Sequence, residues 1–342
     1  MNSSVFFSFL LACTNTKDTD NTFTPCSATI ESTYPLPNSE NVYYRDNLSF
    51  SFSEKISDAE VTLTDASGTS ISGEIAQDDT SIIFTPSSPL QPSTSYQAAL
   101  SYCGSADPVL IEFKTTDLGT PLANGNSDLL SKTYAVDLES GEILEPAGVG
   151  ELLRAFLSNT FLIHVVETTD SSISVRSALS ADDSVEQDFC VSTLEEFPVI
   201  DMTQSPYFSL ANDTLQLNVS AYNVKIYQFQ VLGTFASDAS SFQQAYITGE
   251  LDAREAYTLL TDFGIAAENE DDVCGLLQNF GAECIECSSD GAPYCLRIVI
   301  DDIVANAVDE IIYPVCQGDC HERCELNLET CTEPQAQNDT CD

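Results

Sequence analysis

Short alternating runs of hydrophobic and polar residues fill the first third of the chain, from about residue 30 to residue 116. Turn residues interrupt these runs about every 8 to 12 positions, a spacing typical of β-sandwiches. The segment Asp65-Ala66-Ser67-Gly68 has the composition of a hairpin turn. The residues expected to share strand faces are Leu48, Phe50 and Phe52; Val61 and Leu63; and Ile82 and Phe84. The pattern therefore predicts an all-β sandwich in this part of the chain.

A different pattern covers residues 129–313. Between Tyr207 and Leu251, hydrophobic residues recur at every second position, which predicts an antiparallel meander with one apolar face. The Ile- and Val-rich run 296–304 predicts a further strand. The segments with helical spacing are 149–157, 253–261 and 271–279. The sequence therefore predicts an α+β domain over residues 129–313, in which a long antiparallel sheet packs a few helices on one face.

The N-terminus carries an apolar run from Val5 to Leu11. This run is far shorter than the ~20 apolar residues needed to cross a bilayer, but it suits the core of a signal peptide. The segment Leu10-Leu11-Ala12-Cys13 resembles the lipobox of bacterial lipoproteins, in which the cysteine is acylated and the preceding peptide is removed. The alternative is an ordinary cysteine that follows an apolar N-terminus.

The lipobox resemblance implies a signal peptide over residues 1–12, a lipid on Cys13 and a solvated tether over residues 13–25. Thr14 stands where some lipoproteins carry an Asp that retains them in the inner membrane. The resemblance therefore implies a protein anchored by lipid in the bacterial outer membrane, either facing the periplasm or exposed at the surface.

Five motifs in the predicted sandwich follow one another in the order found in a known family. They are Tyr34-Pro35, Phe52-Ser53-Glu54, Phe84-Thr85-Pro86, the run Pro89-Leu90-x-Pro92-x-Thr94-x-Tyr96, and Phe113-x-Thr115-Thr116. Together they resemble the SbsA-type Ig-like module of bacterial S-layer and surface proteins. The resemblance implies a sandwich over residues 26–117 that acts as a spacer or adhesive unit, followed by a linker over residues 118–128.

Two further expectations depend on this resemblance. Tyr96 would form a tyrosine corner, in which the hydroxyl bonds to nearby backbone and closes one end of the sandwich. Cys26 precedes the first strand and Cys103 follows the strand that begins near Tyr96, so these two cysteines are expected to pair in a disulfide.

Net charge narrows the range of partners. The chain has 54 Asp and Glu against 11 Lys and Arg, a formal net charge of −43, which disfavours nucleic acid and anionic lipid headgroups as partners. The acidity is typical of a solvated surface. Weak, scattered Ca²⁺ or Mg²⁺ binding is the alternative, although no segment has the spacing of an EF-hand loop. No cofactor is predicted.

The chain contains 13 cysteines, and lipidation of Cys13 would leave an even number. In an exported protein these are expected to be oxidised. The disulfide candidates are Cys26, Cys103, Cys190, Cys274, Cys284, Cys287, Cys295, Cys316, Cys320, Cys324, Cys331 and Cys341. Cys284 and Cys287, and the later series with His321 nearby, also have the spacing of zinc ligands. Residues 314–342 are too poor in apolar residues to form a core and are predicted to be a cross-linked tail.

Catalytic chemistry is poorly supported. The chain has two histidines, and His164 alternates with apolar neighbours as a strand residue would. No nucleophile elbow, zinc-protease helix, phosphate-binding loop or dinucleotide motif is present. Arg254 is the one possible ligand contact, for an anionic group, and the structural alternative is an ion pair with Asp252 or another carboxylate. We therefore predict no catalytic residues and no enzymatic activity.

These observations predict a membrane-anchored, disulfide-bonded surface lipoprotein with a structural, adhesive or envelope-interaction role. Its expected partners are the membrane, through the lipid, and an envelope or cell-surface protein. The alternatives are a carrier that holds a lipid or small apolar molecule in a cavity of the second domain, and a hydrolase. Parts of the second domain, such as Ala147-Gly148-Val149-Gly150 and Gly233-Thr234-Phe235, resemble lipoproteins of myxobacteria, a resemblance that brings no activity with it.

Overall fold

The computed structural model describes most of the chain between residues 27 and 315. The described residues are 27–104, 107–138, 141–146, 148, 160–181, 184–189, 193, 198–219, 222–254, 257, 269 and 272–315. The predicted signal peptide, the lipidation site Cys13, the tether and the tail from residue 316 onward lie outside these ranges. In the described part of the chain, we find no helix with both the length and the apolar character needed to cross a membrane.

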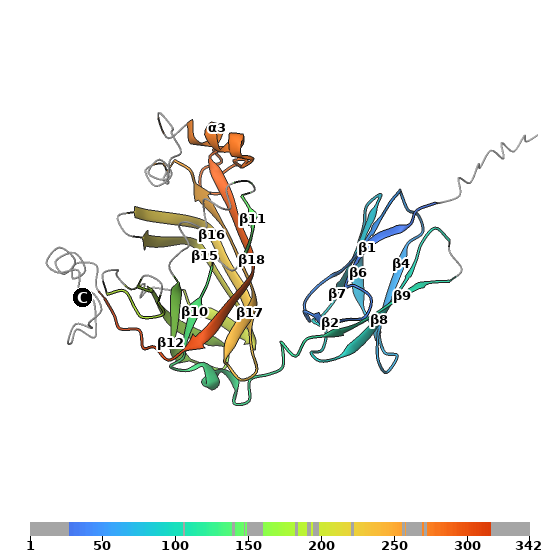
Figure 1. Cartoon of the computed structure of the whole chain (residues 1–342), viewed down its shortest axis with the longest axis horizontal. Coiled ribbons are helices and arrows are strands. Elements are labelled where there is room, and N and C mark those ends of the chain that lie inside the picture. The colour runs from blue at the N-terminus through green and yellow to red at the C-terminus, as the bar shows by residue number, and fades with distance from the viewer. Residues whose placement is uncertain are drawn as a thin grey trace, which may run out of the picture. The chain divides into compact units, whose positions relative to one another are not determined.

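The first folded region is a sandwich of two sheets (Figure 1). One sheet has the order β1 (Ile30–Tyr34), β3 (Leu48–Phe52), β7 (Ser81–Pro86), β6 (Gly73–Gln77). The other has the order β2 (Ser39–Val42), β9 (Val109–Thr115), β8 (Ser95–Ser101), β4 (Glu60–Asp65), β5 (Ser70–Ile71). The sandwich predicted from the alternating pattern is confirmed.

The inward faces of these strands are the ones that the sequence predicts. Leu48, Phe50 and Phe52 are buried at alternate positions of β3, and Phe50 pairs with Ile82 of β7. The predicted turn after β4 is also present: Gly68 has φ of +82°, and Asp65 Oδ1 accepts the backbone N–H groups of residues 67 and 69. The alternation of apolar and polar residues and the turn residues are therefore sufficient to predict the strands of the first folded region.

Tyr96 forms the expected tyrosine corner. Its hydroxyl oxygen accepts the backbone N–H of Gln91 at 2.8 Å, and its ring stacks on Phe113 at a centroid distance of 5.6 Å. The adjacent Thr115 hydroxyl donates to the carbonyl of Gln91 at 2.6 Å. Three buried side chains thus fix the loop that precedes β8.

The second folded region is a closed antiparallel barrel, and the predicted α+β domain is wrong. The sheet order is β10 (Thr133–Val136), β12 (Phe161–Thr168), β13 (Ser172–Leu179), β14 (Ile200–Gln204), β15 (Tyr207–Val219), β16 (Tyr222–Phe235), β17 (Ser241–Asp252), β18 (Cys295–Val308). The first and last strands also pair, with Thr133 opposite Val308, so eight strands close on themselves (Figure 1). A ninth strand, β11 (Glu142–Glu145), pairs with β18 at Ile143 and Ile300. The meander predicted between Tyr207 and Leu251 is present as β15, β16 and β17 and forms one wall of the barrel.

Side chains from all eight barrel strands meet in one hydrophobic core. Residues of every strand of a closed sheet contact one another only on its inner side, so this core fills the interior. The predicted sheet therefore buries its apolar face against itself instead of against helices. Helical structure is limited in the described residues to η1 (Gly125–Leu129), α3 (Val273–Leu277), η3 (Gln278–Phe280) and single helical positions at Tyr257 and Asp272. The predicted helix 271–279 is present over residues 272–280, as α3 flanked by 3₁₀ turns. Of the predicted helix 253–261 the structure describes only residues 253, 254 and 257, and the predicted helix 149–157 lies outside the described residues.

Three β-bulges bend neighbouring strands of the barrel. Gln228 in β16, Gln244 in β17 and Asp302 in β18 have φ of 49°, 49° and 54°, and each lies where its strand has one residue more than the partner strand. Bulges of this kind increase strand twist and curvature. They give the long strands the bend that a closed barrel needs.

Candidate functional site

The richest cluster of interacting polar side chains in the described residues lies where β17 ends. Asp252 is the last residue of β17 and is buried, with 4% of its surface exposed. Arg254 follows two residues later and donates to it three times: from the backbone N–H at 2.9 Å, from Nε at 3.0 Å and from Nη2 at 2.6 Å. The charge of the buried carboxylate is thus balanced by its own neighbour in the chain.

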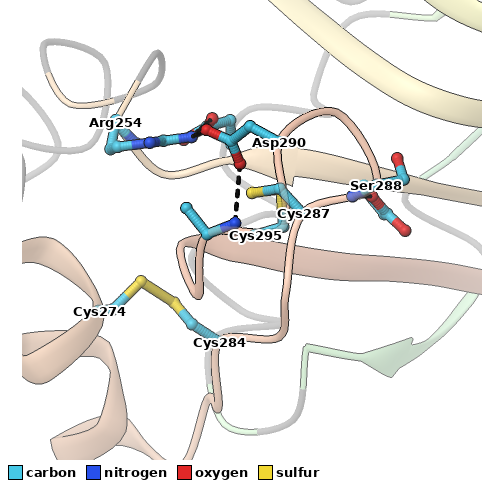
Figure 2. Close-up of a disulfide and its surroundings, with 10 residues drawn as sticks. Arg254, Cys274, Cys284, Cys287, Ser288, Asp290 and Cys295 are labelled. Atoms are coloured by element: carbon cyan, nitrogen blue, oxygen red, sulfur yellow. Dashed lines mark hydrogen bonds and ion pairs between the residues drawn. A yellow bond between two sulfur atoms is a disulfide. The ribbon is translucent and has the colours of Figure 1, made fainter.

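A loop closed by a disulfide completes the cluster. Cys287 and Cys295 are bonded, and Asp290 at the loop tip accepts Nη2 of Arg254 at 2.8 Å (Figure 2). The guanidinium carbon lies 4.8 Å from the centre of the Tyr294 ring, within cation–π range. The loop is therefore held both by a covalent bond at its base and by Arg254 at its tip.

Hydrogen bonds within the loop set the charge state of its groups. The backbone N–H of Ala292, together with the Arg254 guanidinium, holds the pKa of Asp290 below its usual range. The hydrogen bonds to Asp252 and then to Asp290 raise the pKa of Arg254. Glu250 of β17 also accepts the backbone N–H of Ser288 at 2.9 Å. Asp290, Arg254 and Glu250 therefore all serve to position the loop.

A second disulfide, Cys274–Cys284, joins α3 to the segment that leads into the loop (Figure 2). Of the other disulfide candidates, Cys103 is disulfide-bonded, and its expected partner Cys26 lies outside the described residues. The candidates Cys190, Cys316, Cys320, Cys324, Cys331 and Cys341, and also His321, lie outside them as well. The zinc-ligand alternative for Cys284 and Cys287 does not agree with the structure, because each sulfur is bonded to another cysteine.

One group in the described residues has the geometry of a metal site. The ligand atoms of Asp252, Cys287 and Cys295 lie within 4.8 Å of one another and all three residues are buried. Both sulfurs belong to the disulfide, and Arg254 already occupies the carboxylate. Because metals bind thiolates and free carboxylates, these residues as they stand do not fit a metal ion.

Arg254 forms the ion pair with Asp252 that is the structural alternative to ligand binding. Sequence reasoning did not find Asp290 or Tyr294 as its other contacts, because Asp290 lies 36 residues away. It also did not find the partner of His164, whose Nδ1 lies 2.7 Å from the hydroxyl of Thr133 on the neighbouring strand. The Asp290-Gly291 pair, a frequent turn dipeptide, was the one local signal for the loop.

Comparison with known proteins assigns part of the chain to a family. Residues 25–106 match the family described as the bacterial Ig-like domain. No curated protein matches the chain. The matched family assigns no catalytic residue to this chain.

Two solved structures that are similar to the chain are both distant from it. L,D-transpeptidase 1 of Mycobacterium tuberculosis is 12% identical with a TM-score of 0.22, over 46% of this chain and 82% of that one. The N-terminal part of the bacterial S-layer protein SbsC is 11% identical with a TM-score of 0.21, over 46% of this chain and 42% of that one. At these scores neither similarity supports a conclusion about the barrel. The sequence motifs, the sandwich and the family match together show that residues 25–106 are a bacterial Ig-like domain.

Proposed function

We propose that this chain is an exported lipoprotein of the bacterial outer membrane with a structural, adhesive or envelope-interaction role. A lipid on Cys13 attaches it to the membrane, and the Ig-like domain acts as a spacer between that anchor and the barrel. The partner is an envelope or cell-surface protein. The observation that carries the proposal is the pair of disulfides at the end of the barrel, in a chain with a surface-protein domain.

The disulfides support export. Cys274–Cys284 and Cys287–Cys295 each close a short loop, with sequence separations of 10 and 8. Disulfides persist in the periplasm and at cell surfaces and are rare in the cytosol. A bacterial Ig-like domain is typical of surface proteins, and it agrees with the same compartment.

The filled interior of the barrel favours a structural role over a carrier role. Tyr134, Phe208, Phe235 and Phe242 are all buried, and their rings contact one another at centroid distances of 5.0 to 5.7 Å. An eight-stranded barrel is just wide enough for side chains to fill it or for one small ligand. Here aromatic side chains occupy the interior, where a carrier would bind its ligand.

Labelling with radioactive palmitate tests the anchor. Wild type produced in a Gram-negative host should incorporate the label and fractionate with the outer membrane, whereas Cys13→Ala should do neither. The control is Cys26→Ala, which removes a nearby cysteine and should be labelled like wild type. Equal labelling of Cys13→Ala and wild type, or an unlabelled wild type, would overturn the proposal.

Native mass spectrometry of the detergent-extracted protein tests the carrier alternative. Because the interior is filled, we expect no bound ligand. Once detergent is removed, the measured mass should equal that of the acylated chain alone. A lipid or other apolar molecule that remains bound, and that is lost when Phe208→Ala disturbs the aromatic interior, would favour the carrier instead.

A further inference from the structure

Residues Glu310 to Val315 cross the outer face of the barrel outside any strand of the sheet, and we call them the strap. One residue, Asp309, separates the strap from the end of β18 at Val308. Its Ile312 side chain is 1% exposed and packs against Leu162 and Ala178, which point outward from β12 and β13. The strap therefore covers an apolar patch that the closed barrel leaves on its outside.

Side chains of the barrel, instead of a ladder of backbone bonds, hold the strap. The Thr133 hydroxyl donates to the carbonyl of Glu310 at 2.5 Å, and Nη1 of Arg176 donates to the carbonyl of Ile312 at 3.1 Å. Further along, the side-chain amide of Gln187 donates to the carbonyl of Tyr313 and accepts its N–H, each at 2.8 Å. Attachment thus depends on a small number of polar side chains.

His164 lies at the centre of this attachment. Thr133, His164 and Arg176 are directly opposite one another on β10, β12 and β13, so they form one row across the outer face. The Thr133 hydroxyl has one hydrogen, which it donates to the carbonyl of Glu310. In its contact with His164 the Thr133 oxygen must therefore accept, so Nδ1 of His164 carries a proton. Because the pKa of His164 is lowered, the imidazole is neutral at pH 7, with its one proton on Nδ1 and with Nε2 unprotonated.

A second proton on His164 would weaken this arrangement. The resulting imidazolium would be 9% exposed and directly across the strand pair from the Arg176 guanidinium, which holds Ile312. Other charged residues on the described elements around it are Lys132, which precedes β10, Glu167 in β12, Glu186 and Asp188 on either side of Gln187, and Glu310 of the strap, with Asp309 just before it. Burial first, and the Arg176 charge second, lower the pKa of His164. Both effects oppose protonation while the strap is bound.

We propose that the strap is an acid-releasable segment: proton uptake by His164 frees residues 310–315 from the row Thr133, His164 and Arg176. At neutral pH the strap is bound and His164 is neutral. Because the folded-state pKa is lowered, the stability that neutral His164 gives to the bound strap is complete above the ordinary His pKa. It is lost as pH falls below that value. Release exposes Leu162 and Ala178.

Hydrogen exchange of the full chain, followed by mass spectrometry, tests this proposal. The amides of Tyr313 and Val315 donate to Gln187 and Thr193, so peptides that cover the strap report its attachment. From pH 7.5 to pH 5.0, after correction for intrinsic exchange, wild type should lose strap protection severalfold. The upper limit is ~30-fold, set by a fall of about 1.5 pH units below the ordinary His pKa of about 6.5. Peptides from β17 and β18 should keep their protection.

Two variants make the test specific. His164→Asn keeps a donor near the Nδ1 position but does not titrate, so its strap protection should not change between the two pH values. His321→Asn removes the other histidine of the chain and should behave as wild type. The proposal is overturned if wild-type strap protection is independent of pH, if His164→Asn keeps the acid loss, or if β17 and β18 lose protection to the same extent as the strap.

Discussion

Asp252 and Arg254 are joined by three hydrogen bonds, although a single residue separates them in the chain. The pair forms where β17 ends and the chain turns, and the same guanidinium continues to Asp290 on the loop closed by Cys287 and Cys295. One short segment therefore connects the end of a barrel strand to a loop that is distant in sequence. Arg254, in a chain with few basic residues, therefore has a structural role: it joins the end of β17 to this loop.

Arg254→Gln should destabilise the barrel because it leaves the buried Asp252 carboxylate without its counter-charge. The Asp252 carboxylate is 5% exposed, so losing its partner costs more than losing an exposed ion pair does. Urea unfolding of the full chain measures this change. Arg297→Gln is the control, because its contact with Glu145 is exposed and should contribute less than about 1 kcal/mol. If the two substitutions lowered the free energy of unfolding equally, the structural role of Arg254 would be contradicted.

Replacement of both Cys287 and Cys295 by Ala should lower the free energy of unfolding by about 2 kcal/mol. The value lies at the low end for disulfides because the closed loop is short. The same variant should speed amide exchange at Ala292, whose N–H donates to Asp290 at 2.9 Å. If thermal unfolding and exchange at Ala292 were both unchanged, the disulfide would have no part in ordering the loop.

Tyr96→Phe should destabilise the Ig-like domain by about 1 kcal/mol, because the Gln91 N–H loses its acceptor at a partly buried position. The urea unfolding transition of the domain within the full chain gives the value. Tyr102→Phe is a matched control, since it keeps the ring that contacts Phe52 at 4.9 Å. A loss of stability as large in the control as in Tyr96→Phe would show that the corner is not the cause.

Gln228→Gly should stabilise the barrel slightly, by about 0.5–1 kcal/mol. A side chain at φ of 49° costs roughly 1–2 kcal/mol, and removing it outweighs the entropy that glycine adds to the unfolded chain. Gln230→Gly, two positions along the same strand and without positive φ, should instead destabilise by about 0.5–1 kcal/mol. Chemical unfolding of both variants measures whether each substitution raises or lowers the free energy of unfolding. The bulge account fails if they change stability in the same direction.

The sequence predicts the Ig-like domain more completely than the barrel, and the reason is the range of the interactions. Alternation at Leu48 and Phe50 and the local bond from Gln91 to Tyr96 are short-range features. Closure of the barrel instead depends on the pairing of Thr133 with Val308, which no local pattern reports. A meander with one apolar face is compatible with helices on that face or with closure on itself, and sequence periodicity does not distinguish the two.

In the candidate sites, too, contacts between near neighbours could be predicted from the sequence, whereas contacts between distant residues could not. Arg254 and Asp252 are near neighbours, so their ion pair was a possible interpretation of the sequence. Asp290 joins them across 36 residues, and Thr133 meets His164 across 31, so only the fold reveals these contacts. Period-two alternation placed His164 on a strand, but it did not show that residues 310–315 cover that side of the strand.

Mass spectrometry of the native protein tests the proposed export, oxidation and lipid attachment together. The protein is extracted from its own membrane, treated with an alkylating reagent without reduction, and its peptides are weighed by mass spectrometry. We predict a mature chain that begins at acylated Cys13, with intact Cys274–Cys284 and Cys287–Cys295 cross-links. A chain that retains Met1 and carries alkylated cysteines at these positions would contradict the account.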